Sequence, residues 1–287
     1  MTSKNIEIVP TGEALGAEVR GVDIRSLSGE TFKQILEAWH KYQVLVIRNQ
    51  TLTNSELIAY AKLFGNIQLP RKSLVDKDPW IPEHPEILVV SNLKDAKGKA
   101  LGALGAGEAM WHADMTYLEE VPLGSILYAI EVPMKDGETS FCNQRLAFET
   151  LPQELKEKIN GRKLIHDHAH NSTGAITSNW TEQINPMDTP GARHPIFVDH
   201  HTKKYKHMFL GRRPHAYIVG LSLDESEDLL NKLWAHATQE EFSWTHEWKV
   251  GDVVIWDNWS TLHHRNPFDE SKRRIMHRTQ IEGVKPS

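Results

Sequence analysis

The chain has 287 residues, of which 39% are hydrophobic and 25% are charged, and its formal net charge is −5 at pH 7. This composition is ordinary for a globular protein, and the negative charge gives no reason to expect nucleic acid or an anionic membrane as a partner. No apolar run approaches the ~18 residues of a transmembrane helix.

Cysteine usage and the start of the sequence favour a cytoplasmic location. Cys142 is the single cysteine, so no internal disulfide can form, which is typical of a reducing compartment. The first residues lack the apolar stretch of a secretory signal. Because all-β barrels often reach this length as one unit, we expect residues 1–287 to form a single domain.

The first third of the chain has a mixed pattern. Apolar residues at helical spacing predict helices over residues 28–43 and 54–64, the second of them stopped by Gly65. Apolar runs predict strands over residues 44–47 and 86–93.

Residues 94–110 follow, and they are rich in Gly, Ala and Lys. This composition predicts a mobile loop. Loops on rigid scaffolds often carry binding function, so we expect an active-site lid around residues 94–110.

From Trp111 onward the pattern is mainly β. Helices are expected only over residues 146–160 and 224–237. Strands are predicted at 124–132, 138–143, 163–168, 194–198, 207–210, 253–256 and 274–281. Many short strands with a few covering helices are typical of a jelly roll, so the expected fold is a cupin-like double-stranded β-helix.

The W-H-A-D segment places a histidine and a carboxylate two residues apart, at His112 and Asp114. On a strand such residues point to the same face, so both side chains can reach one metal ion. Short motifs of this kind are common by chance. A further histidine about 150 residues later would complete the two-histidine, one-carboxylate set of non-haem Fe(II) oxygenases, which leaves coordination positions open.

Five motifs in a fixed order make the pattern specific. They are W-H-A-D-M-T-Y at 111–117, P-x-G-S-I-L-Y-A at 122–129, D-G-E-T at 136–139, W-D-N-W-S-T-L-H at 256–263 and R-R-I-M-H-R-T at 273–279. Together they resemble the taurine dioxygenase family, the Fe(II)- and 2-oxoglutarate-dependent dioxygenases that include the 2,4-D dioxygenases. The resemblance covers nearly the whole chain and implies a homo-oligomer.

The resemblance also implies roles for individual residues. It makes His112, Asp114 and His263 the ligands of Fe(II), with His263 rather than its neighbour His264 as the distal ligand. It makes Arg274 and Thr139 the residues that bind 2-oxoglutarate. A planar guanidinium suits this task because it can make two charge-assisted hydrogen bonds to one carboxylate.

Arg278 lies four residues beyond Arg274, where the resemblance implies a contact with the acidic group of the substrate. Strand geometry directs both arginines to the same face, and an inward guanidinium is costly unless it is paired. We therefore expect an anionic substrate, with Trp259 packing against its apolar part. The alternative is that Arg278 pairs with an internal acid such as Asp257. A surface turn at 211–214 also offers Arg212 and Arg213 to an anion.

The implied reaction couples decarboxylation of 2-oxoglutarate, with O₂, to hydroxylation of a small organic substrate, and gives succinate and CO₂. Bond cleavage can follow the hydroxylation, and desaturation or epoxidation are variants. Candidate substrates are sulfonates, phosphonates, aryloxyalkanoates and amino-acid derivatives. Two alternatives come from other classes, namely a non-catalytic metal-binding module on the same fold and a zinc hydrolase on the same ligands.

Overall fold

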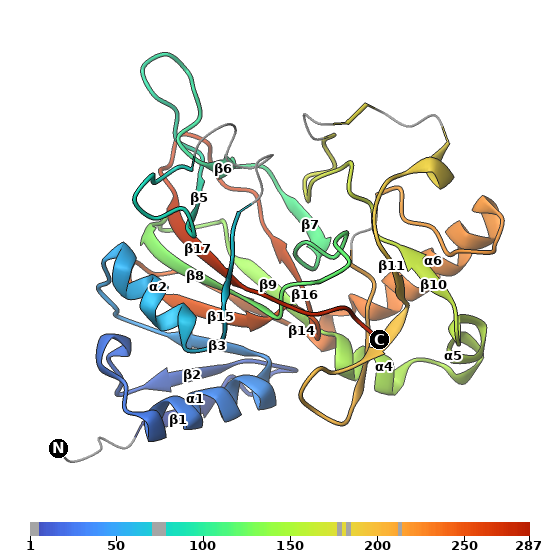
Figure 1. Cartoon of the computed structure of the whole chain (residues 1–287), viewed down its shortest axis with the longest axis horizontal. Coiled ribbons are helices and arrows are strands. Elements are labelled where there is room, and N and C mark those ends of the chain that lie inside the picture. Colours follow the sequence, from blue (N-terminus) through green and yellow to red (C-terminus); the bar gives the residue numbers. More distant parts are fainter. Residues whose placement is uncertain (1–5, 71–78, 177–179, 182–184, 212–213) are drawn as a thin grey trace.

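The computed structural model describes residues 6–70, 79–176, 180–181, 185–211 and 214–287. Two β-sheets form its centre, with helices at either side (Figure 1). The larger sheet has nine strands in the order β1-β2-β3-β15-β8-β17-β5-β6, and β4 also pairs with β17. These strands are β1 (Glu7–Pro10), β2 (Ala17–Arg20), β3 (Val44–Ile47), β4 (Ile67–Gln68), β5 (Leu88–Ser91), β6 (Ala103–Leu104), β8 (Gly124–Glu131), β15 (Val253–Asp257) and β17 (Ile275–Ile281).

The smaller sheet has four antiparallel strands in the order β14-β9-β16-β7. They are β7 (Ala109–His112), β9 (Thr139–Asn143), β14 (Ser243–His246) and β16 (Thr261–Arg265). Along the chain, β7, β8 and β9 alternate between the two sheets, and so do β14, β15, β16 and β17. This alternation is that of a double-stranded β-helix, so the predicted jelly-roll fold is confirmed.

Side chains of the central strands alternate between two apolar layers, as strand geometry requires. Leu127 and Val254 point into the sandwich, where they pack with Phe141 of the opposite sheet. Their neighbours Ile126 and Ile255 point to the outer face. Each such large apolar side chain contributes roughly 1.5–3 kcal/mol when it is fully buried, so both faces of the large sheet are stabilised.

Two helices cover the outer face of the large sheet, α1 (Gly29–Tyr42) and α2 (Asn54–Lys62). Ser28 caps α1, and Thr53 and Glu56 form a capping box at the start of α2. Side-chain caps of this kind satisfy backbone N–H groups that have no partner within the helix. Both helices were predicted from the sequence to within two residues at each end.

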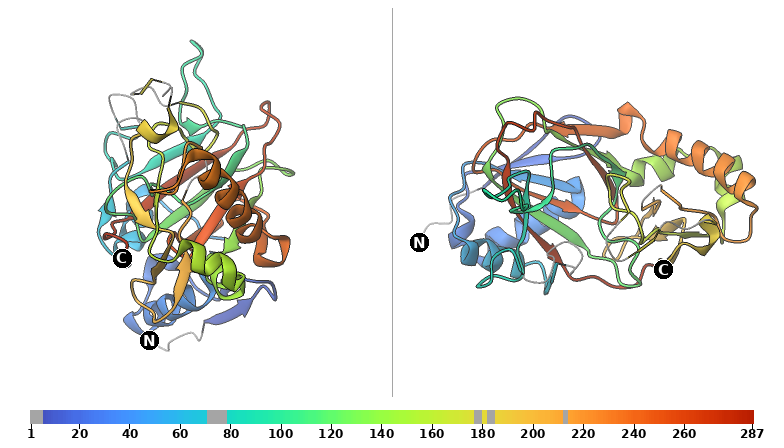
Figure 2. Two further views of the ribbon diagram at one scale, coloured as in Figure 1. Left: turned by 90° about the vertical axis from the view of Figure 1, so that its right-hand side faces the viewer. Right: turned by 90° about the horizontal axis from the view of Figure 1, so that it is seen from above.

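The outer face of the small sheet packs against a second helical layer, made by α4 and α6. Seen from above, α6 lies at the end of the molecule opposite the N-terminal helices (Figure 2). The helices are α4 (Gln144–Thr150), α5 (Gln153–Ile159) and α6 (Leu223–Ala237). Two hairpins accompany them, formed by β10 (Lys163–Ile165) with β11 (Arg193–Pro195) and β12 (Phe197–Asp199) with β13 (Lys206–Met208). Short 3-10 turns lie at Ile24–Ser26, Pro186–Asp188 and Glu240–Phe242.

The structure differs from the predicted secondary structure in several places, among them one helix and one strand. The single helix expected over residues 146–160 is two helices, because Pro152 lies between them and the preceding Leu151 adopts ψ of 130°. A residue before proline is disfavoured in the helical region. The strand Thr261–Arg265 was missed, although it lies inside the W-D-N motif region and is hydrogen-bonded on both edges.

The expected lid region has more structure than a loop. Residues 94 and 100 form an antiparallel bridge, and this turn projects from the body of the molecule (Figure 1). The chain then returns through β6 and enters β7 at Ala109.

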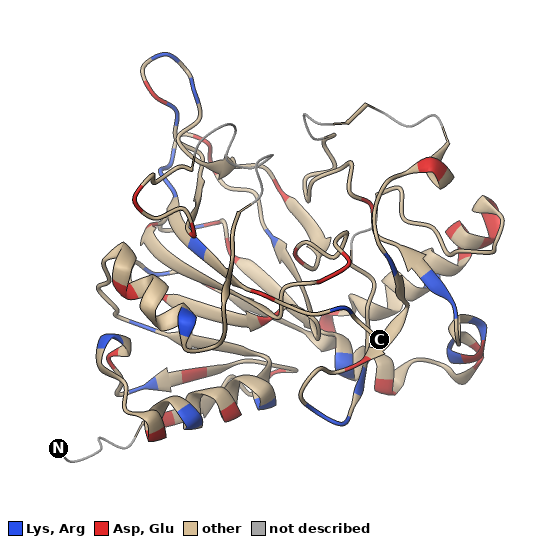
Figure 3. Cartoon of the chain, in the orientation of Figure 1, with Lys and Arg blue, Asp and Glu red and all other residues tan. Residues whose placement is uncertain are grey.

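Acidic and basic side chains are interspersed over the surface, and α1 carries both signs (Figure 3). Among the described residues, no helix is both long and apolar enough to span a bilayer.

Candidate metal centre and co-substrate pocket

His112, Asp114 and His263 lie together inside the sandwich, and all three are buried. The Nε2 atoms of His112 and His263 lie 3.8 and 3.9 Å from Oδ1 of Asp114. The three ligand atoms lie within 4.8 Å of one another, and the two ring centroids are 4.1 Å apart. Small adjustments would therefore bring all three atoms to ~2.1 Å from one ion. Two imidazoles and one carboxylate fit a facial triad that leaves positions open.

Antiparallel pairing places the two histidines. His112 on β7 and His263 on β16 are directly opposite each other across the strand pair. Nδ1 of His112 donates a hydrogen bond to the Met110 carbonyl at 2.7 Å. This contact fixes the ring and leaves Nε2 unprotonated, as binding of a metal requires. The neighbouring His264 instead contacts Glu108, with 2.7 Å between Nε2 and Oε1.

Asp114 lies beyond the last residue of β7, so the expectation that His112 and Asp114 share one strand is wrong. The chain turns at Met115, which has φ of 54°. Asn258 holds this turn, because its Oδ1 accepts from the Asp114 backbone N–H at 2.7 Å and its Nδ2 donates to the Asp114 carbonyl at 2.8 Å. The N of W-D-N thus positions a metal ligand 144 residues away, a role that the motif alone did not reveal.

The Asp114 carboxylate has further partners. Ser125 Oγ donates to its Oδ2 at 2.9 Å, and Gln280 Nε2 donates to Ser125 Oγ at 3.2 Å. Arg278 Nη1 donates to both carboxylate oxygens. Burial raises the pKa of Asp114, but the positive charge of Arg278, with smaller contributions from the neighbouring histidines and the Ser125 hydroxyl, outweighs this, so the pKa lies below its ordinary value. The carboxylate is therefore ionised, as a metal ligand must be.

Arg274 and Thr139 face the same cavity as the two histidines. The Arg274 side chain is buried, and its Nε has no hydrogen-bond partner among the described residues. Burial, followed by the charge of Arg265, lowers the pKa of Arg274 to about 9. A buried guanidinium without an acidic partner is costly, so the position fits a carboxylate supplied by a ligand. Thr139 Oγ1 accepts from Trp248 Nε1 at 2.9 Å, which leaves the threonine hydroxyl proton able to donate.

The cavity has about 460 Å³ of empty space, which includes the part open to solvent. Three arginines line it, namely Arg265, Arg274 and Arg278. The sequence motifs gave no sign of Arg265, although it lies two residues after His263 and therefore on the same strand face. The other lining residues are His112, His263, Thr139, Val90, Leu104, Ala109, Leu127, Ser172 and Trp256. Arg212 and Arg213 lie outside the described residues.

Trp259 does not line this cavity, which corrects the expected contact with substrate. Its Nε1 donates to the Val121 carbonyl at 3.1 Å, and its ring packs against Phe209 with centroids 5.8 Å apart. Asp257 Oδ1 accepts from the backbone N–H groups of Trp259 and Ser260. This capped turn directs the indole into a separate apolar cluster.

His200, His201 and Asp257 form a second set of donor atoms within 4.8 Å of one another. Here His200 Nε2 donates directly to Asp257 Oδ2 at 2.6 Å, and its Nδ1 accepts from the Lys203 backbone N–H at 3.2 Å. Both ring nitrogens of His200 are thus satisfied, and the pair orders the W-D-N turn. Asp257 is therefore occupied by His200, and the acidic partner of Arg278 is Asp114 instead.

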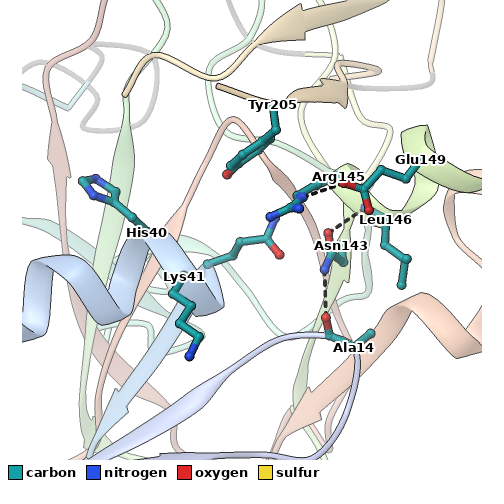
Figure 4. Close-up of a pocket in the computed structure, with 9 residues that line it drawn as sticks. Ala14, His40, Lys41, Asn143, Arg145, Leu146, Glu149 and Tyr205 are labelled. Atoms are coloured by element: carbon teal, nitrogen blue, oxygen red, sulfur yellow. Dashed lines mark hydrogen bonds and ion pairs between the residues drawn. The ribbon is translucent and has the colours of Figure 1, made fainter. Parts of the chain in front are cut away.

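A separate pocket lies between α1 and α4 (Figure 4). Arg145 in this pocket donates to Glu149 at 2.8 Å, and its guanidinium lies over the Tyr205 ring at 4.7 Å. Asn143 Nδ2 donates to the Ala14 carbonyl. None of its lining residues lines the metal cavity, so it is a distinct surface feature whose polar groups are largely paired.

Comparisons with known proteins agree with this geometry. The family model described as taurine catabolism dioxygenase TauD, TfdA family matches residues 7–280. The chain is 31% identical to the (S)-phenoxypropionate/alpha-ketoglutarate-dioxygenase of Sphingobium herbicidovorans, over 98% of this chain and 96% of that protein. It is 30% identical to the alpha-ketoglutarate-dependent 2,4-dichlorophenoxyacetate dioxygenase of Cupriavidus pinatubonensis, over 94% and 95% respectively. The crystal structure of AAD-2 in complex with Mn(II) and N-oxalylglycine matches with a TM-score of 0.78 and 28% identity, and covers 99% of both chains.

Proposed function

Because this chain belongs to the taurine catabolism dioxygenase TauD, TfdA family, we propose that His112, Asp114 and His263 bind its metal and that Arg274 and Thr139 bind its co-substrate. The chain is a 2-oxoglutarate-dependent dioxygenase that uses Fe(II), 2-oxoglutarate and O₂. The observation that carries the residue assignment is the placement of the three metal-ligand side chains and Arg274 around one buried site.

The reaction converts 2-oxoglutarate to succinate and CO₂ and hydroxylates a C–H bond of the substrate, with cleavage of an adjacent bond in some cases. The bound metal supplies the redox chemistry with O₂. Strands β7 and β16 place the two histidines opposite each other. The Met110 carbonyl orients His112, and the charge of Arg278 helps to keep Asp114 ionised. Family membership sets aside the non-catalytic module and the zinc hydrolase as alternatives.

The proposed substrate is a small organic anion such as an aryloxyalkanoate, sulfonate, phosphonate or amino-acid derivative. Arg278 lines the cavity, and its Nε has no hydrogen-bond partner among the described residues. One edge of its guanidinium binds Asp114, so its other donors remain for a substrate. The names of the two similar dioxygenases both contain an aryloxyalkanoate, which supports a carboxylate substrate for this chain.

The wider assignments belong to the same proposal. Residues 1–287 act as one catalytic domain, with residues 94–110 as its lid. The lone buried thiol of Cys142 is compatible with a cytoplasmic location. Assembly as a homo-oligomer is supported by the family resemblance, and sedimentation of the purified chain tests it.

Succinate release from a substrate panel tests the proposed function. Sulfonates, phosphonates, aryloxyalkanoates and amino-acid derivatives would be assayed with Fe(II), 2-oxoglutarate and O₂, each beside its neutral methyl ester or amide. We expect anionic members to stimulate succinate formation and their neutral counterparts to give little. Preferential turnover of the neutral counterparts would contradict the role of Arg278. The His263→Ala variant is the negative control, and we expect it to release no succinate.

A further inference from the structure

The short segment Leu104–Glu108 connects the two sheets across the co-substrate pocket. Leu104 ends β6, at one edge of the large sheet, and β7 begins at Ala109, at one edge of the small sheet. Both Leu104 and Ala109 line the cavity that holds Arg274. The position of this segment therefore decides how far that side of the cavity is closed.

One guanidinium organises the segment. Arg265 Nη1 donates to the Gly105 carbonyl at 2.9 Å, and Nη2 donates to the Leu104 carbonyl at 3.2 Å and to the Gly107 carbonyl. Three carbonyls of one turn thus converge on a single buried side chain. Two outer contacts support the turn, from the Phe268 backbone N–H to the Ala106 carbonyl at 3.3 Å and between His264 and Glu108.

Arg265 also lies beside the carboxylate site. It is directly opposite Thr139 in the pairing of β16 with β9. The guanidinium carbons of Arg265 and Arg274 lie 5.6 and 5.8 Å from the Phe268 ring centroid. Within the described part of the chain, no carboxylate forms an ion pair with either arginine. Two like charges in a buried site repel each other, and an anion bound at Arg274 would relieve that repulsion.

We infer that Arg265 is a positioning residue that holds Leu104–Glu108 closed over the co-substrate pocket, and that a carboxylate bound at Arg274 strengthens this closure. The inference rests on the proposed function, in which Arg274 binds the distal carboxylate of 2-oxoglutarate. Coupling of this kind is reciprocal, so the closed segment must in turn raise the affinity for 2-oxoglutarate.

Two replacements of Arg265 separate its hydrogen bonds from its charge. Arg265→Met removes the three carbonyl contacts and also the positive charge beside Arg274. Titration calorimetry of 2-oxoglutarate into the Mn(II)-loaded protein should show a Kd increased about fivefold or more, the lower end of usual coupling factors. Arg265→Lys keeps the positive charge but not the planar fork that reaches several carbonyls. If Arg265 acted by charge alone, Arg265→Lys would bind 2-oxoglutarate nearly normally; if the carbonyl contacts matter, its Kd should rise as in Arg265→Met. An unchanged or lower Kd in Arg265→Met, or a normal Kd in Arg265→Lys, overturns the inference.

Hydrogen–deuterium exchange reports the closure itself. In the unsubstituted protein, 2-oxoglutarate should slow exchange of amides 104–108, and in Arg265→Met these amides should exchange faster and show no such slowing. If 2-oxoglutarate did not change the exchange rate of amides 104–108 in the unsubstituted protein, the inference would be overturned while the proposed function stayed intact. If binding of 2-oxoglutarate did not depend on Arg274, both this inference and the proposed function would be overturned.

A second variant covers the case in which Arg265→Met does not fold. Gly105 has φ of 47°, and a Cβ added to it would meet no other atom within 4 Å, so Gly105→Val strains the turn without a clash at that atom. Gly98→Val is its matched control, because Gly98 has φ of 80° and equally open surroundings but lies outside the pocket lining. We expect weaker 2-oxoglutarate binding from Gly105→Val alone, and equal effects of the two variants would contradict the assignment.

Discussion

Nη1 of Arg278 lies 3.1 Å from Oδ1 and 3.2 Å from Oδ2 of Asp114, so one guanidinium contacts both oxygens of the proposed metal-ligand carboxylate. The arginine expected to meet the substrate is therefore also a neighbour of the metal centre. A substrate anion at Arg278 would be held beside the ion, which is where its oxidised carbon must lie.

The metal ligands give the first prediction. His112→Ala, Asp114→Ala or His263→Ala should each abolish turnover and weaken Mn(II) binding measured by calorimetry, because each removes one of three protein ligands. His264→Ala is the matched control, since that ring contacts Glu108 at the surface. Equal loss of metal from the His263→Ala and His264→Ala proteins would show that the distal ligand is wrongly assigned.

The residues proposed to bind the co-substrate give the second prediction. Arg274→Ala leaves a bound carboxylate poorly paired, which costs ~2–5 kcal/mol, or roughly 30- to several-thousand-fold in affinity. Thr139→Ala removes one hydrogen bond to a charged group and should cost less, ~1.5–3 kcal/mol. Titration of the Fe(II)–2-oxoglutarate charge-transfer band without O₂ measures both, and wild-type affinity in Arg274→Ala would refute the assignment.

Arg278 gives the third. Arg278→Met should raise the KM of an anionic substrate by at least about tenfold, the effect of ~1.4 kcal/mol, while 2-oxoglutarate binds normally. Because the substitution removes a positive charge next to Asp114, metal affinity should hold or increase. Arg273→Met is the control, as Arg273 is exposed and pairs with Glu131. An unchanged KM would show that Arg278 pairs with Asp114 and does not bind the substrate.

His207 gives a prediction for pH. Burial lowers the pKa of this fully buried histidine to about 4. The unfolded chain takes up a proton near pH 6.5, whereas the folded chain resists it until about pH 4, so stability falls as pH falls through this window. The group contributes at most roughly 1.4 kcal/mol per pH unit. Urea unfolding between pH 7 and 5 should show a shallower pH slope for His207→Phe, and an identical slope would contradict this.

Local signals in the sequence were sufficient for α1, α2 and α6 and for the strongly apolar strands of the large sheet. The apolar spacing predicted the starts of α1 and α2 to within one residue, and Ser28 and Thr53 cap them. The strand that carries His263 was missed because T-L-H-H-R has no apolar alternation, and its stability comes from pairing with β7 and β9.

The metal ligands followed from family motifs, but the residues that position them did not. Asn258 binds the backbone of Asp114, and Arg265 binds backbone carbonyls of residues 104–107. Every residue carries the same backbone N–H and C=O groups, so a motif cannot predict which distant segment will supply the hydrogen-bond partners. The buried position of Trp259 was not predicted for the same reason, since its partner is the Val121 carbonyl.

The pairing of His112 with His263 across adjacent strands also bears on how the protein matures. One donor is residue 112 and its partner is residue 263, on a strand hydrogen-bonded on both edges. A nascent chain on the ribosome therefore cannot assemble the ligand set until residue 263 has been synthesised and β16 can pair with β7. Bringing such distant segments together is slow compared with local helix formation. Binding of the metal by the complete ligand set thus requires that β7 and β16 have already paired.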